Sequence, residues 1–92
     1  MPTESAIVQR IMTQLKQLPN TKALKLHGSI YAERGTPDIH ITHQGRSYWC
    51  EVKQPGCMLT LIQAQRLKEW QDAGAIVGVV HSWDEVRKIL SL

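Results

Sequence analysis

Apolar and polar side chains alternate along residues 38–43 and again along residues 46–53, with Gln44-Gly45 between the two stretches. A period of two is typical of half-buried strands, and a glycine-containing pair between such strands indicates a tight turn. The pattern predicts a β-hairpin with an apolar face formed by Ile39, Ile41, Tyr48, Cys50 and Val52. Its other face would carry Asp38, His40, Thr42, Trp49, Glu51 and Lys53. Two acids and a lysine therefore lie on adjacent strands of one hairpin.

Residues 3–18 are predicted to form the first helix, because apolar residues recur there at helical spacing and Thr3 is a favourable N-cap. The apolar stripe consists of Ile7, Val8, Ile11, Leu15 and Leu18. Glu4 lies on this stripe as well. Its charge would either suit the first turn of the helix, which is worth roughly 0.3–1 kcal/mol, or reach the polar face of the hairpin. The helical pattern leaves both interpretations open.

A second helix is predicted over residues 61–73, since Thr60 and Gln63 form a capping box before it and Gly74 ends it. The residues expected to face the sheet are Ala64, Leu67 and Trp70. Gln65 lies off this stripe. It is either an ordinary exposed glutamine or a side chain that leans over the polar face of the hairpin.

A third helix is predicted over residues 83–90, after the capping pair Ser82 and Glu85. Its buried side would carry Trp83, Val86, Ile89 and Leu90. Residues 22–33 predict a strand that is interrupted near its glycine. Residues 75–81 form a continuous apolar run, which is typical of a buried central strand. The order α-β-β-β-α-β-α predicts a mixed α/β (α+β) fold, with a small mixed β-sheet flanked by helices.

The length of 92 residues predicts one domain over residues 1–92, with a core near the lower size limit for stable folding. A net charge of +3 favours an anionic partner without proving one. No apolar run approaches the roughly 20 residues of a membrane helix, and the first residues lack the pattern of a secretory signal. Cys50 and Cys57 form neither a disulfide framework nor a metal-ligand spacing. We therefore expect an intracellular, cytoplasmic protein with reduced thiols and no membrane partner.

Other kinds of site find less support. The four histidines show no metal-ligand spacing on a shared element, although His40 shares the strand face of Asp38. No glycine motif for binding phosphates or dinucleotides is present. The serines and cysteines lack an evident histidine–aspartate partner set. Trp49 would either stack on a nucleobase or pack against its neighbours, whereas Trp70 and Trp83 are expected in the core.

Asp38, Glu51 and Lys53 form the candidate site. Two carboxylates brought together repel each other unless a cation lies between them, and Mg²⁺ prefers oxygen ligands while keeping waters that a phosphate can displace. A lysine on the same face would orient or deprotonate the attacking water, or neutralise charge on a phosphate. The alternative is a surface hairpin with a cross-strand ion pair, worth under about 1 kcal/mol.

The order of the motifs along the chain resembles a known nuclease family. Gly35-Thr36-Pro37-Asp38, followed by Glu51-Val52-Lys53, resembles the signature of the PD-(D/E)XK nuclease superfamily. With the following helix, which carries Gln65, and the strand over residues 75–80, the chain is similar to the virus-type replication–repair nuclease (VRR-NUC) domain. Glu4 extends the match to the first helix, so that the resemblance spans nearly the whole chain. It implies a restriction-endonuclease-like core of the stand-alone phage and bacterial type.

The resemblance implies a metal-dependent endonuclease acting on DNA. Asp38 and Glu51 would hold Mg²⁺ or Mn²⁺, helped by the backbone carbonyl of Val52. Lys53 would position or activate the attacking water. Small stand-alone relatives imply a branched substrate, such as a four-way (Holliday) junction in DNA repair.

The resemblance also bears on the first and second helices. Gln65 matches the glutamine of the family's helix after the lysine motif, and Glu4 matches the acid of its first helix, which favours a role for Glu4 in the site. A small domain with many apolar positions predicts a homodimer, as in the stand-alone relatives. The rival hypothesis is a catalytically silent nucleic-acid-binding or assembly module of the same fold.

Overall fold

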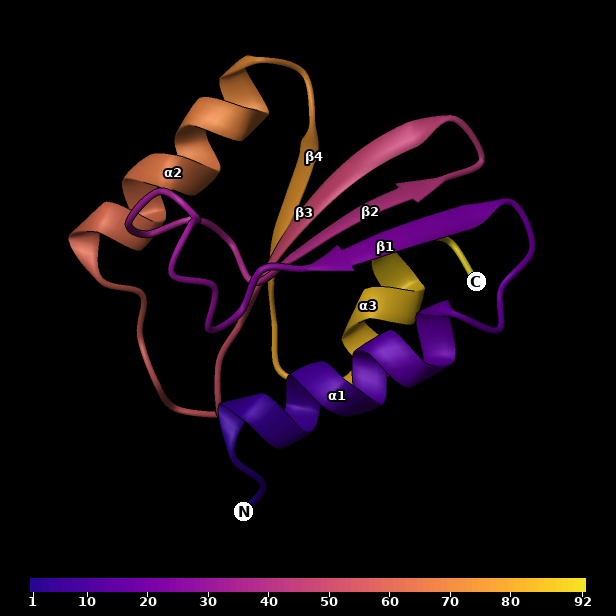
Figure 1. Cartoon of the computed structure of the whole chain (residues 1–92), viewed down its shortest axis with the longest axis horizontal. Coiled ribbons are helices and arrows are strands. Elements are labelled where there is room, and N and C mark those ends of the chain that lie inside the picture. Colours follow the sequence, from indigo (N-terminus) through magenta and orange to yellow (C-terminus); the bar gives the residue numbers. More distant parts are fainter.

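A computed structural model describes all residues of the chain, 1–92. Its elements are α1 (Glu4–Leu15), β1 (Thr21–Lys25), β2 (Ile39–His43), β3 (Arg46–Val52), α2 (Leu61–Asp72), β4 (Ile76–Val80) and α3 (Trp83–Ile89). The order α-β-β-β-α-β-α and the α+β class are as predicted (Figure 1). None of the three helices combines the length and the apolar character that crossing a bilayer requires.

The four strands form one mixed sheet in the order β1-β2-β3-β4. β1 pairs antiparallel with β2, and β2 pairs antiparallel with β3, whereas β3 and β4 are parallel. The predicted hairpin is formed by β2 and β3, with Ile39 opposite Cys50. Its turn residues Gln44 and Gly45 both have positive φ, 49° and 82°. Two positive φ values in a two-residue loop match the twist of the flanking strands, so the turn fixes the register.

The sheet has a different cover on each face. α1 and α3 cover the face that carries the predicted apolar residues of the hairpin, and α2 lies against the other (Figure 1). The core between the sheet, α1 and α3 includes Ile11, Leu15, Ile39, Ile41, Tyr48, Cys50, Val52, Val80, Val86 and Leu90. Alternation along the hairpin therefore separates an apolar face from a face left available for polar side chains.

The helix ends follow the predicted caps. Thr3 accepts a hydrogen bond from the backbone N–H of Ala6, and Thr60 and Gln63 make the reciprocal bonds of a capping box. Ser82 accepts from Glu85 N–H, but the Glu85 carboxylate contacts His81 Nδ1 at 3.0 Å instead of completing a box. Both cysteines are free.

The strand predicted over residues 22–33 is wrong beyond Lys25. The backbone N–H groups of Leu26 and His27 both donate to the carbonyl of Asp38, and Ser29 N–H donates to Leu26 O, so the chain turns away from the sheet. The following apolar residues, Ile30 and Tyr31, then lie in solvent in the loop between β1 and β2. The apolar composition of these two residues therefore does not correspond to a strand.

The prediction of a central strand over residues 75–81 is also wrong. β4 lies at an edge of the sheet and pairs only with β3. Ile76 and Val79 are 39% and 37% exposed. The run is apolar because helices approach the strand from both faces, although its outer backbone edge is unpaired. Trp70, predicted in the core, is 38% exposed, whereas Trp83 packs against the core as expected.

Candidate metal-binding and catalytic site

Asp38, Glu51 and Lys53 meet at one end of the sheet. Asp38 immediately precedes β2, and the register that pairs Ile39 with Cys50 places Asp38 opposite Glu51 in β3. Lys53 follows the last residue of β3. All three are buried, with exposed fractions of 7%, 2% and 7%. A surface hairpin with an exposed ion pair would leave these groups in water, so the burial excludes the alternative of an ordinary surface pair.

The Asp38 carboxylate is fixed through both of its oxygens. Oδ2 accepts a hydrogen bond from the backbone N–H of Val52 at 2.8 Å, and Oδ1 lies 2.9 Å from His27 Nδ1. His27 Nε2 in turn lies 3.1 Å from the Ser5 hydroxyl. These contacts leave the carboxylate little rotational freedom, while each oxygen keeps lone pairs that another partner can use.

His27 is the neighbour of the site that sequence reasoning missed. It lies in the segment wrongly predicted as a strand, and only the turn at Leu26 brings its ring to Asp38. The expectation that no serine has a histidine–aspartate partner set is also wrong, because Ser5, His27 and Asp38 form a hydrogen-bonded chain. No spacing in the sequence signals it, since the three residues come from α1, a loop and the start of β2.

Glu51 is the electrostatically unusual member of the site. Its Oε2 atom is buried and has no hydrogen-bond partner. Burial first, and then the charge of Asp38, raise the pKa of Glu51 to about 8, while Lys53 acts in the opposite direction and Glu4 raises the pKa slightly further. Two carboxylates held side by side out of water are stable together only if a proton or a cation compensates their charge.

Gly35 explains how the loop before Asp38 reaches the site. Its φ is +81°, and a Cβ atom at this position would lie 2.8 Å from Ile62 Cγ1 and 3.0 Å from the Ile62 backbone. Only glycine combines this conformation with such close contact to α2. Arg66 of α2 donates from Nε to the carbonyl of Arg34 at 3.0 Å and pairs with Glu33 at 2.7 Å. The loop is thereby attached to α2 just before Asp38.

The remaining predicted residues lie further from the acid pair. Glu4 is the first residue of α1 and is half-buried, and it acts on Glu51 through its charge. Gln65 is exposed on α2 and donates to Glu69 Oε2 at 3.1 Å. No three histidine, cysteine, aspartate or glutamate side chains converge into a complete metal site. The structure therefore brings together Asp38, Glu51 and Lys53, while Glu4 and Gln65 lie outside this group.

Trp49 lies on the polar face of the hairpin, as predicted, but it is only 7% exposed. Its ring stacks between His40, at a centroid distance of 4.4 Å, and Trp70 of α2, at 4.0 Å. Both faces of the indole are therefore occupied. Of the two interpretations of Trp49, the structure supports the packed aromatic and not a base-stacking residue.

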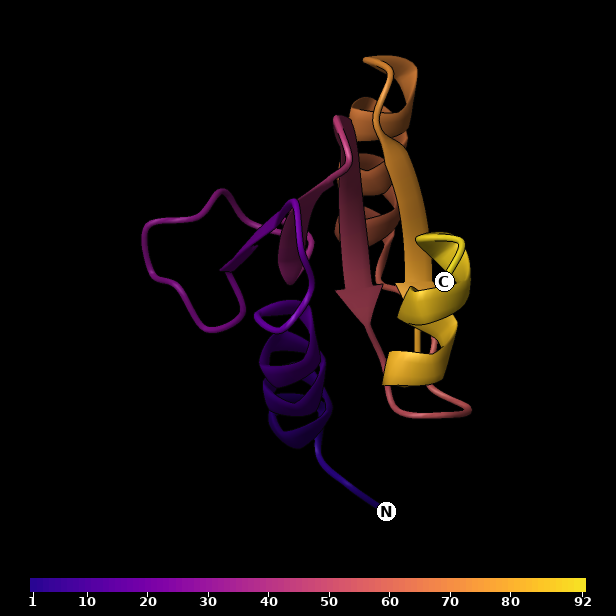
Figure 2. The same ribbon diagram turned by 90° about the vertical axis from the view of Figure 1, so that its right-hand side faces the viewer.

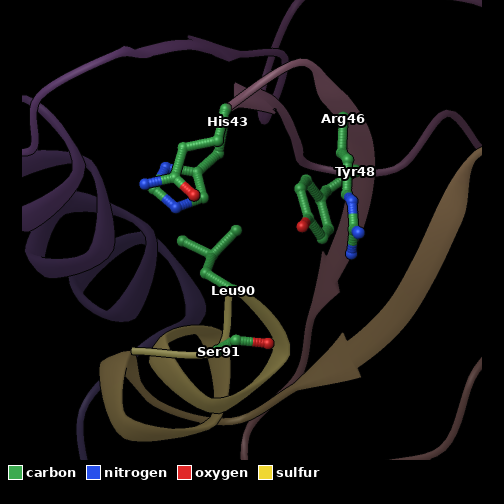
Figure 3. A pocket seen from close by; sticks show the side chains of 6 residues that line it. His43, Arg46, Tyr48, Leu90 and Ser91 are labelled. Carbon is green, nitrogen blue, oxygen red and sulfur yellow. The ribbon is translucent and has the colours of Figure 1, made fainter.

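The largest cavity, about 340 Å³, lies at the opposite end of β3. Figure 3 shows Arg46 and Tyr48 side by side on the strand, facing Leu90 and Ser91 at the end of α3. His43 also lines this cavity, and its Nδ1 atom is 2.7 Å from the Thr21 hydroxyl. No carboxylate side chain lines the cavity, so it lacks an acid pair like that of Asp38 and Glu51.

Comparisons with known proteins agree on the fold. No family model and no curated protein matches the sequence. A solved structure named "VRR_NUC domain" superposes with a TM-score of 0.75 and 24% identity, covering 98% of this chain and 97% of that chain. A second, named "VRR_NUC domain protein", gives a TM-score of 0.74 and 18% identity, covering 98% and 86%. The predicted resemblance to the VRR-NUC domain is thus confirmed at the level of the fold.

Proposed function

We propose that the protein is a divalent-metal-dependent endonuclease that hydrolyses phosphodiester bonds of DNA. The observation that carries this proposal is the buried Oε2 atom of Glu51, which lacks a partner beside a second carboxylate. A hard cation would satisfy both acids at once. The VRR-NUC names of the two similar structures point to the same general activity, a nuclease.

The residues at this end of the sheet fit Mg²⁺ or Mn²⁺. Asp38 and Glu51 would supply two carboxylate ligands, which is the number that Mg²⁺ commonly takes from a protein while keeping waters. Val52 donates its N–H to Asp38, and the next N–H, of Lys53, donates to Val80 in the opposite direction. Since the N–H and C=O of one strand residue point to the same side, the Val52 carbonyl points to the side of the strand on which Asp38 lies and would be a third oxygen ligand.

When bound, the ion supplies Lewis acidity at the phosphate and a lowered pKa for the attacking water. The Lys53 side chain is buried beside Glu51, and no hydrogen bond or ion pair holds it. Its ammonium group is therefore free to donate to the attacking water or to a phosphate oxygen, where it stabilises the developing negative charge. His27 keeps the Asp38 carboxylate in one orientation, as outer-shell partners of metal ligands commonly do.

We further propose that a homodimer presents two such sites to branched DNA, such as a four-way junction. The unpaired edge of β4 supports a protein contact, because Ile76 and Val79 remain over one-third exposed there. A two-fold pair of sites matches a two-fold substrate. Sedimentation equilibrium at micromolar concentration should give twice the 10.4 kDa mass of the chain. An active monomer would overturn both the dimer and the symmetry argument.

The test of the activity uses labelled junction and linear DNA with Mg²⁺, with Mn²⁺ or with EDTA. Cleavage should require the metal. Asp38→Ala or Glu51→Ala should remove several kcal/mol of transition-state stabilisation and so reduce the cleavage rate about 1,000-fold or more. The same variants should lose Mn²⁺ binding in calorimetric titration. Lys53→Ala should abolish cleavage but keep or strengthen Mn²⁺ binding, because it removes a neighbouring cation. Unchanged Mn²⁺ affinity in both acid variants would refute the assignment.

The chain of Ser5, His27 and Asp38 suggests a second candidate, nucleophilic hydrolysis by the serine hydroxyl. This alternative does not explain why Glu51 and Lys53 are buried beside Asp38. Ser5→Ala separates the two candidates, because it would abolish the activity of a serine nucleophile. Under our proposal it removes only one outer hydrogen bond, and metal-dependent cleavage should persist.

A further inference from the structure

Two of the most exposed apolar side chains of the protein are adjacent in the loop between β1 and β2. Ile30 is 86% exposed and Tyr31 is 93% exposed. Figure 2 shows this loop standing out from the sheet and the helices. Loops of a dozen residues without regular structure are uncommon and usually serve a function. An exposed aromatic ring in the middle of such a loop therefore indicates that the loop binds another molecule.

One end of the loop is attached to Asp38 of the acid pair, and the other end is attached to α2. On one side, Leu26 and His27 hydrogen-bond to Asp38. On the other, Glu33 and Arg34 are held by Arg66 of α2. Between these attachments the only side-chain hydrogen bond is the local one from Tyr31 N–H to the Ser29 hydroxyl. The tip is thus supported at its base and free of tertiary contacts at Ile30 and Tyr31.

We propose that this tip binds an unstacked base of the DNA substrate, with Tyr31 stacking on the base. The inference rests on the proposed function, and it names a substrate class within it: DNA with an unpaired or easily unstacked nucleotide near the cut. Trp49 cannot take this role, because its two faces are covered by His40 and Trp70. Tyr31 is the one aromatic side chain near the site that is almost fully exposed.

The charges around the tip favour DNA over a protein or a lipid surface. Lys25 precedes the loop and Arg34 lies near its end, and neither side chain has an ion-pair partner. A stacking ring flanked by free cations is the arrangement with which proteins bind single-stranded nucleic acid, since a base meets the ring and its phosphates meet the cations. Leu61, also exposed, begins α2 next to Ile62, which contacts Gly35. It extends the apolar surface at the foot of the loop.

The position of the recognised base follows from the length of the chain. Tyr31 is four residues from His27, which contacts Asp38, and an extended chain spans at most about 3.6 Å per residue. The Cα atoms of Tyr31 and His27 therefore lie within about 14 Å of each other, and the two side chains add to the distance between the tyrosine ring and the acid pair. The stacked base would therefore lie within about one helical turn of DNA, roughly 34 Å, of the phosphate that is cut.

The test uses DNA carrying 2-aminopurine, whose fluorescence falls when the base stacks on a protein ring. The probe sits in a three-nucleotide flap or in the matching fully paired duplex, with EDTA present to prevent cleavage. The wild type should quench the flap probe, and Tyr31→Ala should lose the quenching and bind the flap DNA about five- to tenfold more weakly. Tyr31→Trp should restore both. Leu92→Ser, which removes an exposed apolar side chain at the far C-terminal end, should behave like the wild type.

The outcomes separate this inference from the endonuclease proposal. Equal quenching and affinity in wild type and Tyr31→Ala would overturn the inference, even if the protein cleaves DNA. Loss of self-association in Tyr31→Ala, with unchanged DNA binding, would assign the tip to a second copy of the chain and overturn it as well. Quenching that depends on Tyr31, in a protein that cleaves no DNA with Mg²⁺ or Mn²⁺, would support the inference and refute the endonuclease. A wild type that binds no DNA would overturn both.

Discussion

Two pairs of adjacent residues, Asp38-Ile39 and Glu51-Val52, face in opposite directions from the same two strands. All four are buried, the apolar members to 0% exposure and the acids to 7% and 2%. Ile39 and Val52 belong to the apolar core beneath α1 and α3. Asp38 and Glu51 lie side by side at one end of the other face, where one carboxylate oxygen has no partner. Equal burial therefore has opposite consequences on the two faces.

The two faces differ in what burial does to the stability of the protein. On the core face, every buried side chain removes apolar area from water, at about 25 cal/mol per Å². On the site face, a buried carboxylate without a partner lowers stability until a cation or a proton compensates it. Violations of the packing rules are expected at functional sites. Substitutions on the two faces of the same strands separate these two contributions.

The largest expected effect is on the core face. Ile39→Ala should lower the free energy of unfolding by about 2–5 kcal/mol, because it leaves a cavity in a fully buried cluster. Asp38→Asn, one residue earlier, should change stability far less, since an amide oxygen can still accept from Val52 N–H. Urea denaturation measures both. Similar losses in the two variants would show that the site face also stabilises the fold.

The next effect concerns the support of Asp38. His27→Ala should reduce Mn²⁺ affinity or the cleavage rate by about 10- to 100-fold, the usual range for an outer-shell partner of a metal ligand. The His27 side chain is 27% exposed, so the melting temperature should change little. His27→Asn keeps a donor and should recover part of the loss, and Ser5→Ala should have a smaller effect. Full activity of His27→Ala would show that the Val52 N–H alone orients Asp38.

A smaller effect is the dependence of stability on pH, which we expect for the site face and not for the core face. The pKa of Glu51 is raised from 4.5 to about 8, first by burial and then by Asp38. Between these two pH values the folded protein holds a proton that the unfolded chain has lost. Without metal, the free energy of unfolding should therefore fall as pH rises through this window. At pH 8, Glu51→Gln should melt higher than the wild type, by a few degrees in a domain of this size.

With divalent metal at pH 8, the wild type should instead melt higher than Glu51→Gln. Binding displaces the proton from Glu51, so Mn²⁺ affinity should increase as pH rises towards 8. Thermal unfolding with and without Mn²⁺ at pH 6 and pH 8 measures both effects. Ile41→Ala provides the control, because Ile41 is fully buried on the core face of the same hairpin and its loss of stability should not depend on pH or on metal. A wild type whose apo stability is flat over this range would contradict the raised pKa.

Local signals in the sequence predicted most of this architecture. The alternation in β2 and β3, the turn at Gln44-Gly45 and the caps at Thr3 and Thr60 each depend on neighbouring residues, and all are present in the structure. The acid pair was predictable because a hairpin places Asp38 opposite Glu51 by register alone. The local sequence pattern was therefore sufficient to predict those elements that depend on residues close together in the chain.

The errors arose where the structure depends on tertiary contacts. The sequence of β4 is apolar because two helices cover its faces, and nothing in that run says that its outer edge is unpaired. Ile30 and Tyr31 have strand-like composition, but the bonds from Leu26 and His27 to Asp38 end the strand before them. His27 reaches the site through the same turn. Its role could not be derived from spacing, because no periodic pattern connects it to Asp38.

The smallest expected effect tests the reach of the site beyond the two strands. Glu4 acts on Glu51 only through its charge, as the last of the contributions to the raised pKa of Glu51. As a first-turn acid it should stabilise α1 by roughly 0.3–1 kcal/mol, so Glu4→Gln should lower the melting temperature only slightly. If Glu4 also orients water at the site, cleavage should fall by about tenfold or more while Mn²⁺ binding stays near that of the wild type.

The control for Glu4→Gln is Glu85→Gln, which removes an acid from the first turn of α3, away from the acid pair. Glu85→Gln should cause a comparable small loss of stability without a loss of activity. Activity equal to the wild type in Glu4→Gln would restrict the chemistry to the polar face of β2 and β3. The charge of Glu4 would then serve only the N-terminal end of its helix, and its place on the apolar stripe of α1 would follow from the helix dipole alone.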